Sequence, residues 1–146
     1  MYALHGCKKI VYLDRPLYHY RKVEGTLTSS FRPMFIQQWG TLFTIMEEII
    51  EEKNLGKEYR EALSNRIALS ITAVGLNELS NKQNGHIGHI KVIRDYLKQE
   101  RYQKSVAKLQ IKNLPLPWKL LMISCKARCA IAVYCAIVVI EKLRKR

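Results

Sequence analysis

The chain has 146 residues, 48% of them hydrophobic and 25% charged, and its 25 Lys and Arg against 12 Asp and Glu give a formal net charge of +13. This length suits one domain with a single core, and the hydrophobic content excludes an intrinsically disordered chain. Residues 1–100 carry 14 basic and 11 acidic residues, whereas residues 101–146 carry 11 basic residues and one Glu. The C-terminal third is therefore expected to meet an anionic partner: a phospholipid surface, nucleic acid or a phosphorylated ligand.

Two short strands are predicted at the front of the chain. Residues 9–13 are rich in β-branched and aromatic side chains, and residues 17–21 follow after a break at Pro16. Two strands alone do not make a stable sheet. They are therefore expected either to form a marginal hairpin on the helices or to be the last strands of a larger sheet. A polar loop follows at residues 22–32.

Everything after Pro33 is predicted to be helical. Apolar residues recur at helical spacing, and breaks are expected at Asn54-Leu55-Gly56, at residues 81–85 and at residues 114–117. The sequence thus predicts a mainly α-helical chain, in which a bundle-like tail follows a short two-stranded segment. The predicted helices run from about residue 35 to 53, 57 to 81, 87 to 101 and 118 to 144.

The front segment carries a recognisable pattern. Leu17-Tyr18-His19-Tyr20-Arg21, followed by Gly25-Thr26-Leu27-Thr28, resembles the C-terminal part of family-2 glycosyltransferases, where Leu-Tyr-x-Tyr-Arg and then Ser-(Ile/Leu)-Thr precede a variable helical tail. Thr26 stands where the family has Ser. The resemblance implies that residues 1–32 are the last strands and loop of a larger α/β catalytic domain of the GT-A type. Residues 33–146 would be its C-terminal helical region.

The resemblance also suggests substrate-binding residues: Tyr18, Tyr20, Arg21 and Lys22. The two tyrosines are two residues apart and share one face of a strand, where they can stack on a sugar ring or pack against the sheet edge. Arg21 and Lys22 lead into the loop, where cations can stabilise the diphosphate that leaves when a sugar is transferred. The alternative is packing tyrosines beside a solvated arginine and loop.

The other parts that the resemblance implies are missing from this sequence. The family has a nucleotide-sugar-binding half with an Asp-x-Asp site for Mg²⁺ or Mn²⁺ and an acidic general base, and the chain contains no Asp-x-Asp. We therefore expect it to supply no catalytic residue, no metal ligand and no cofactor, and to be inactive alone. The full enzyme would transfer a sugar from a nucleotide-sugar donor to a glycan or lipid-linked acceptor. The alternative is a non-enzymatic basic helical adaptor that binds a membrane surface or a protein partner.

The last predicted helix raises the question of membrane contact. Residues 129–140 carry no charge, but this run is too short to span a bilayer, which takes about 20 residues. The helix is either buried or lies in a membrane interface with its basic ends on anionic head groups. We expect a cytoplasmic protein, and under the interfacial alternative its peripheral contact with the membrane face is made through residues 118–146. Nucleic-acid binding is not favoured, because no helix-turn-helix signature or RNA-binding aromatic motif is present.

Two further groups of residues have a structural interpretation. The four cysteines lack a Cys-x-x-Cys spacing and are predicted to be buried free thiols in a reducing compartment; they are Cys7, Cys125, Cys129 and Cys135. His86 and His89 have the spacing of metal ligands but no third ligand nearby. Both histidines are predicted to be solvated at a loose helix start.

Overall fold

A computed structural model describes residues 9, 11–12, 14–15, 30–112 and 114–144 of the chain. Within these residues it contains six α-helices and no strand, so the prediction of a mainly helical chain is confirmed. Lys9, Val11 and Tyr12, from the first predicted strand, lie in no strand, and the second predicted strand lies outside the described residues. The helices are α2 (Phe35–Glu52), α3 (Lys57–Leu79), α4 (His86–Leu97), α5 (Glu100–Lys108), α6 (Leu116–Lys126) and α7 (Ala130–Arg144).

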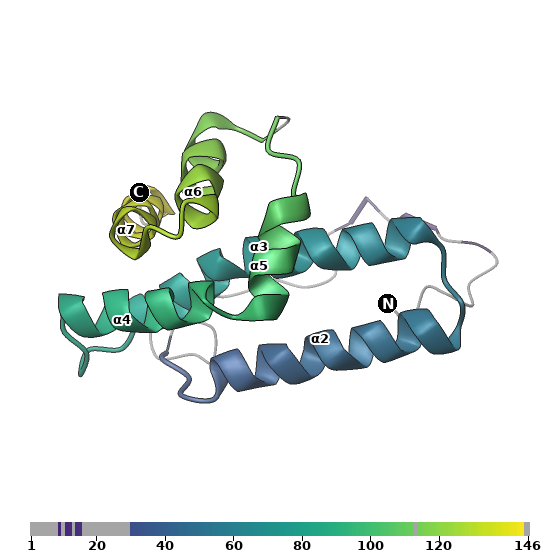
Figure 1. Cartoon of the computed structure of the whole chain (residues 1–146), viewed down its shortest axis with the longest axis horizontal. Helices are drawn as coiled ribbons and strands as arrows, with labels where there is room; N and C mark the ends of the chain where they lie inside the picture. Colours follow the sequence, from purple (N-terminus) through teal and green to yellow (C-terminus); the bar gives the residue numbers. More distant parts are fainter. Residues whose placement is uncertain (1–8, 10, 13, 16–29, 113, 145–146) are drawn as a thin grey trace.

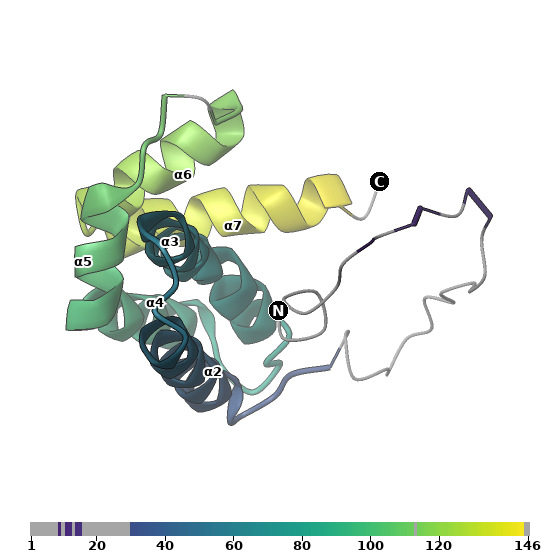
Figure 2. The ribbon, with the colours of Figure 1, turned by 90° about the vertical axis from the view of Figure 1, so that its right-hand side faces the viewer.

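Helix α3 is the centre of the bundle. It runs beside α2 as a helical hairpin and also packs against α4, α5 and α7 (Figure 1). Figure 2 shows α7 along its length, next to α6. The core is formed by apolar side chains from all six helices, including Phe43, Ile71, Val74, Ile93, Leu97, Tyr102, Leu121, Val133 and Ile137.

A glycine sets the distance between α3 and α7. Gly75 is buried, and a Cβ atom added there would lie 2.2 Å from Cδ1 of Ile137. Only a residue without a side chain leaves room for this isoleucine, whose side chain is fully buried. Gly75 therefore lets the two helices pack closely at this point.

The long helix predicted from about residue 118 to 144 is broken in the structure, and that prediction was wrong. Helix α6 ends at Lys126, and Arg128 has a left-handed backbone with a φ of 55°. The Arg128 N–H donates to the Cys125 carbonyl and the Cys129 N–H to the Ser124 carbonyl, both at 3.0 Å. This hydrogen-bond pattern is a Schellman motif, which ends a helix and turns the chain. The two halves, α6 and α7, pack against each other.

The third predicted helix is also divided. Helix α4 ends at Leu97, Gln99 has an extended backbone, and α5 begins at Glu100. The Gln103 side chain links the parts, because its amide nitrogen donates to the Leu97 carbonyl and its amide oxygen accepts from Arg128 Nε at 2.8 Å. Glutamine thus ties the end of α4 to the turn between α6 and α7.

Two of the predictions for cysteines and histidines fail. Cys125 is a buried free thiol, as predicted, but Cys129 and Cys135 are exposed free thiols on the outer side of the α6–α7 unit. His86 is exposed, as predicted, whereas His89 is only 7% exposed. Cys7 lies outside the described residues. His89 is buried where its ring meets the carboxylate of Glu78 from α3.

Candidate functional site

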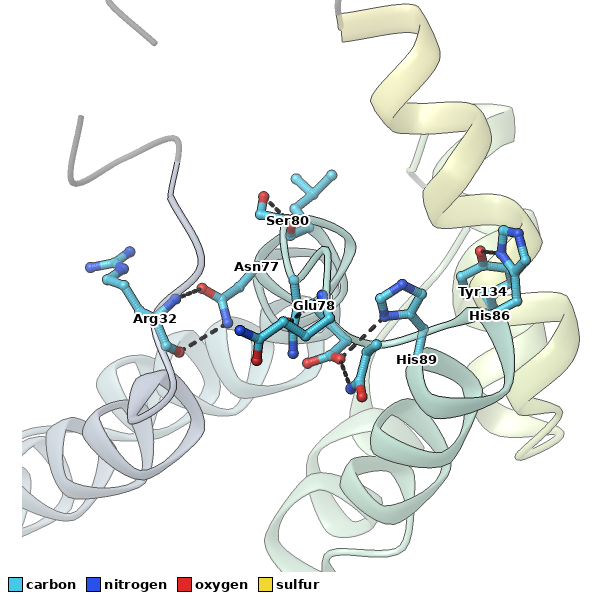
Figure 3. A network of polar contacts seen from close by, with 11 residues as sticks. Arg32, Asn77, Glu78, Ser80, His86, His89 and Tyr134 are labelled. Carbon is cyan, nitrogen blue, oxygen red and sulfur yellow. Dashed lines mark hydrogen bonds and ion pairs between the residues drawn. The ribbon is translucent and has the colours of Figure 1, made fainter. Parts of the chain in front are cut away.

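The substrate-binding residues predicted from the sequence, Tyr18, Tyr20, Arg21 and Lys22, lie outside the described residues. What the structure describes is the place where the chain joins the helical bundle just after them. The Asn77 side chain, near the end of α3, accepts a hydrogen bond from the Arg32 N–H at 3.0 Å and donates one to the Arg32 carbonyl at 3.2 Å (Figure 3). One amide thus satisfies both backbone groups of Arg32 and fixes the chain ahead of α2 to α3.

The residue after Asn77 is a buried acid. Glu78 is 5% exposed, and its Oε1 atom accepts a hydrogen bond from Asn84 Nδ2 at 2.6 Å and lies 3.2 Å from His89 Nδ1 (Figure 3). A buried carboxylate needs such partners, because an unpaired charge away from water is strongly unfavourable. Asn84 lies in the turn before α4 and His89 in its first turns, so Glu78 joins the end of α3 to the start of α4.

Tyr134 extends this arrangement to α7. Its ring stacks on His89, with centroids 6.1 Å apart and an interplanar angle of 17°. Its hydroxyl lies 2.5 Å from Nδ1 of His86, at hydrogen-bond distance (Figure 3). We call the set of Asn77, Glu78, Asn84, His86, His89 and Tyr134 the junction network. It brings α3, α4, α7 and the segment at Arg32 together at one end of the bundle.

The junction network joins the helices through one buried contact between an acid and an imidazole, Glu78 and His89, and the aromatic ring of Tyr134 covers the imidazole. Within the described ranges, no three His, Cys, Asp or Glu side chains gather in a way that could hold a metal ion.

The buried titratable groups of the core are hydrogen-bonded within the bundle. Burial raises the pKa of Tyr96, although its hydroxyl lies 2.7 Å from that of Ser70, a contact that lowers it. Burial also raises the pKa of Tyr102, whose hydroxyl donates to the Ala68 carbonyl at 3.2 Å. The Cys125 thiol, fully buried beside it, has its pKa raised by burial to about 11. These groups are neutral at ordinary pH and act as core residues.

A second feature lies on the outside of α6 and α7. Large apolar side chains are exposed at helical spacing on both helices: Leu116, Leu120 and Ile123 on α6, and Ile131, Val139 and Leu143 on α7, each at least half exposed. The exposed Cys135 lies between Ile131 and Val139 on α7. We call Ile131, Cys135, Val139 and Leu143 the α7 stripe. Trp118, near the start of α6, is partly buried against the core.

None of the described helices is both long enough and apolar enough to cross a membrane. Comparisons with protein-family models, curated proteins and solved structures found no match for this chain.

Sequence reasoning missed the junction network because its members come from three helices and the turn before α4, although five of the six lie within residues 77–89. One signal was present: His89, Ile93 and Tyr96 are spaced by four and three residues, which places His89 on the buried side of α4. Nothing in the sequence paired that histidine with Glu78, eleven residues earlier and on another helix.

Proposed function

We propose that this chain is the C-terminal portion of a family-2 glycosyltransferase. Residues 1–32 would contribute the last strands and loop of a GT-A type catalytic domain, and residues 33–146 its helical region. The observation that carries the proposal is the run Leu17-Tyr18-His19-Tyr20-Arg21, followed by Gly25-Thr26-Leu27-Thr28. The full enzyme would transfer a sugar from a nucleotide-sugar donor to a glycan or lipid-linked acceptor, with Tyr18 and Tyr20 against the sugar and Arg21 and Lys22 near the diphosphate.

The junction network supports this proposal by giving the catalytic part an attachment point. Arg32 is the fourth residue after the end of the pattern at Thr28, and such a segment spans at most about 14 Å. A catalytic domain that ended at this pattern would therefore be tied to the end of the bundle at which Asn77 holds Arg32.

The first test is to read the DNA in frame upstream of Met1. An extension that encodes an Asp-x-Asp and a later acidic general base is expected, whereas an in-frame stop codon directly upstream would reject the proposal. The second test uses the extended enzyme with nucleotide-sugar donors. Replacing Arg21 and Lys22 with Gln is expected to lower turnover strongly, while the matched change Lys9→Gln is not. The chain that begins at Met1 is expected to show no transfer.

A non-enzymatic adaptor that binds an anionic membrane surface is the second candidate, and the α7 stripe favours it. The stripe lies on a helix that is followed by Lys145 and Arg146, and Glu141 is the one acid among residues 101–146. Apolar side chains next to cations suit a helix that lies in the interface of an anionic bilayer. A glycosyltransferase tail could use the same contact, so the upstream sequence decides between the two candidates.

Co-sedimentation with phospholipid vesicles tests the membrane contact itself. Binding is expected for vesicles with anionic lipid, to be weakened by salt, and to be lost in Ile131→Asn/Val139→Asn. Ile87→Asn is the matched control, because Ile87 is 85% exposed but belongs to α4. If the wild-type chain does not bind anionic vesicles, or if Ile87→Asn reduces binding as much as Ile131→Asn/Val139→Asn does, the membrane contact is rejected.

A further inference from the structure

A groove between α2, α3 and α5 has no role in the function proposed above. It consists of two adjoining hollows of about 310 and 570 Å³, and cavities of this size accept small molecules. The floor of the smaller hollow is apolar, because Ile50, Leu63 and Ile67 are buried there. The larger hollow is lined by polar side chains only, among them Asn65 and Gln110.

Three residues line both hollows: Arg60 and Ser64 from α3, and Lys108 from the end of α5. Arg60 and Ser64 are four residues apart and share one face of α3, and Lys108 approaches from the other helix. Within the part of the chain that the structure describes, their side chains take part in no hydrogen bond or ion pair. A guanidinium, a hydroxyl and an ammonium group, each with hydrogen-bond donors available to a ligand, therefore line the same groove.

The other cations of the groove are already paired. Arg101 donates to Glu47 at 3.0 Å and to the Gly40 carbonyl. Lys104 lies 2.6 Å from Glu100 and Lys57 lies 3.3 Å from Glu61. The Arg101 contacts join α5 to α2, and the three pairings leave the positive charge of the groove concentrated on Arg60 and Lys108. Glu51 lines only the smaller hollow, so an anion is favoured on the side of the larger one.

We propose that this groove binds the phosphate group of a small hydroxyl-bearing molecule through Arg60, Ser64 and Lys108. Arginine donates two parallel hydrogen bonds to phosphate oxygens, lysine adds a point charge, and serine donates one more hydrogen bond. The amides of Asn65 and Gln110 can both donate to and accept from the hydroxyl groups of the same molecule. The phosphate belongs either to a soluble compound or to a lipid head group, which has the same chemistry.

Nuclear magnetic resonance titration of the full chain tests this site with inorganic phosphate, glycerol 3-phosphate and vesicles that contain phosphatidic acid. The soluble probes are expected to shift amide signals of residues 57–65 and 104–110 first, with glycerol 3-phosphate binding more tightly than phosphate. Shifts at these amides with the vesicles alone would support the site and assign the phosphate to a lipid. Shifts spread evenly over the basic surface, or none with any probe, would overturn the proposal.

Variants separate this site from the general positive charge of the protein. Arg60→Gln/Lys108→Gln is expected to weaken glycerol 3-phosphate binding by about tenfold or more, since it removes two charge-assisted contacts. Ser64→Ala, which keeps the charge and the fold, is expected to weaken it by about threefold. Lys82→Gln/Lys91→Gln removes the same charge from exposed positions outside the groove and is expected to have no effect. An equal loss in this control would overturn the proposal.

Discussion

The close packing of α3 on α7 at Gly75 leads to a prediction whose size follows from the structure. A methyl group at residue 75 would lie 2.2 Å from Cδ1 and 3.1 Å from Cγ1 and Cγ2 of Ile137, inside a fully buried site. Such overpacking costs about 1–3 kcal/mol, against about 1 kcal/mol gained when alanine replaces glycine within a helix. Gly75→Ala is therefore expected to lower the free energy of unfolding by about 1 kcal/mol.

Gly40 provides the matched control, because it lies inside α2 and a Cβ atom added there would meet nothing within 4 Å. Gly40→Ala is expected to raise the free energy of unfolding by about 1 kcal/mol, so the two alanine variants should differ by about 2 kcal/mol. Urea unfolding followed by the helical circular-dichroism signal measures both. If Gly75→Ala stabilised the protein as much as Gly40→Ala does, the packing of α7 on α3 described here would be wrong.

A double-mutant cycle assigns the cost to the proposed contact. Ile137→Val removes the Cδ1 atom and by itself is expected to cost about 1 kcal/mol. In the Gly75→Ala background the same change relieves the clash, so it should cost little or even stabilise the protein. The expected coupling energy is about 1 kcal/mol, and a coupling near zero would mean that the two residues do not touch.

Three other changes follow from the buried polar and thiol groups. Glu78→Ala is expected to cost about 3 kcal/mol in urea unfolding, because it leaves the imidazole and amide donors of the junction network without an acceptor, and Glu78→Gln should cost less. Native-state alkylation followed by mass spectrometry should modify Cys129 and Cys135 and spare Cys125, whose thiol has its pKa raised to about 11; rapid labelling of Cys125 would contradict its burial. Because burial raises the pKa values of Cys125 and Tyr102, the folded state keeps protons that the unfolded state releases, so stability should be fully present below pH 9 and fall as the pH rises towards 11. Tyr102→Phe should make stability fall less steeply as the pH rises. If the slope of stability against pH is the same in this variant, Tyr102 does not contribute to the pH dependence.

The helical content and most helix limits could be predicted from the sequence, and two turns show why the rest could not. Both α2 and α6 end in a Schellman motif with a left-handed residue. At the first turn that residue is Asn54, in the run Asn54-Leu55-Gly56, and the end of the helix was predicted there. At the second turn it is Arg128, a residue type that rarely adopts this backbone, so no local signal marked the end of the helix there. Tertiary contacts hold this turn in place, since Arg128 donates to Gln103.

The candidate site was predictable to a smaller extent. The resemblance in residues 17–28 rests on a local pattern and stays a prediction, because these residues lie outside the described ones. The junction network and the phosphate groove each combine side chains from separate helices, and helical periodicity reports which face is buried but not which helices meet. Lys108 illustrates this, because it acts together with Arg60 only after α5 folds back across α3.

The junction network has a mechanical consequence. Asn77 and Glu78 are neighbours on α3, so a pull on the backbone at Arg32 loads the same helical turn that Glu78 connects to His89, and through the stacked rings to Tyr134. Tyr134 lies on the helix that carries the exposed apolar stripe. A displacement at Arg32 would therefore reach the last helix through a line of three polar and aromatic contacts. These contacts act in addition to the packing of α7 on α3 and α4, so the segment ahead of α2 and the last helix are coupled by polar groups as well as by the apolar core.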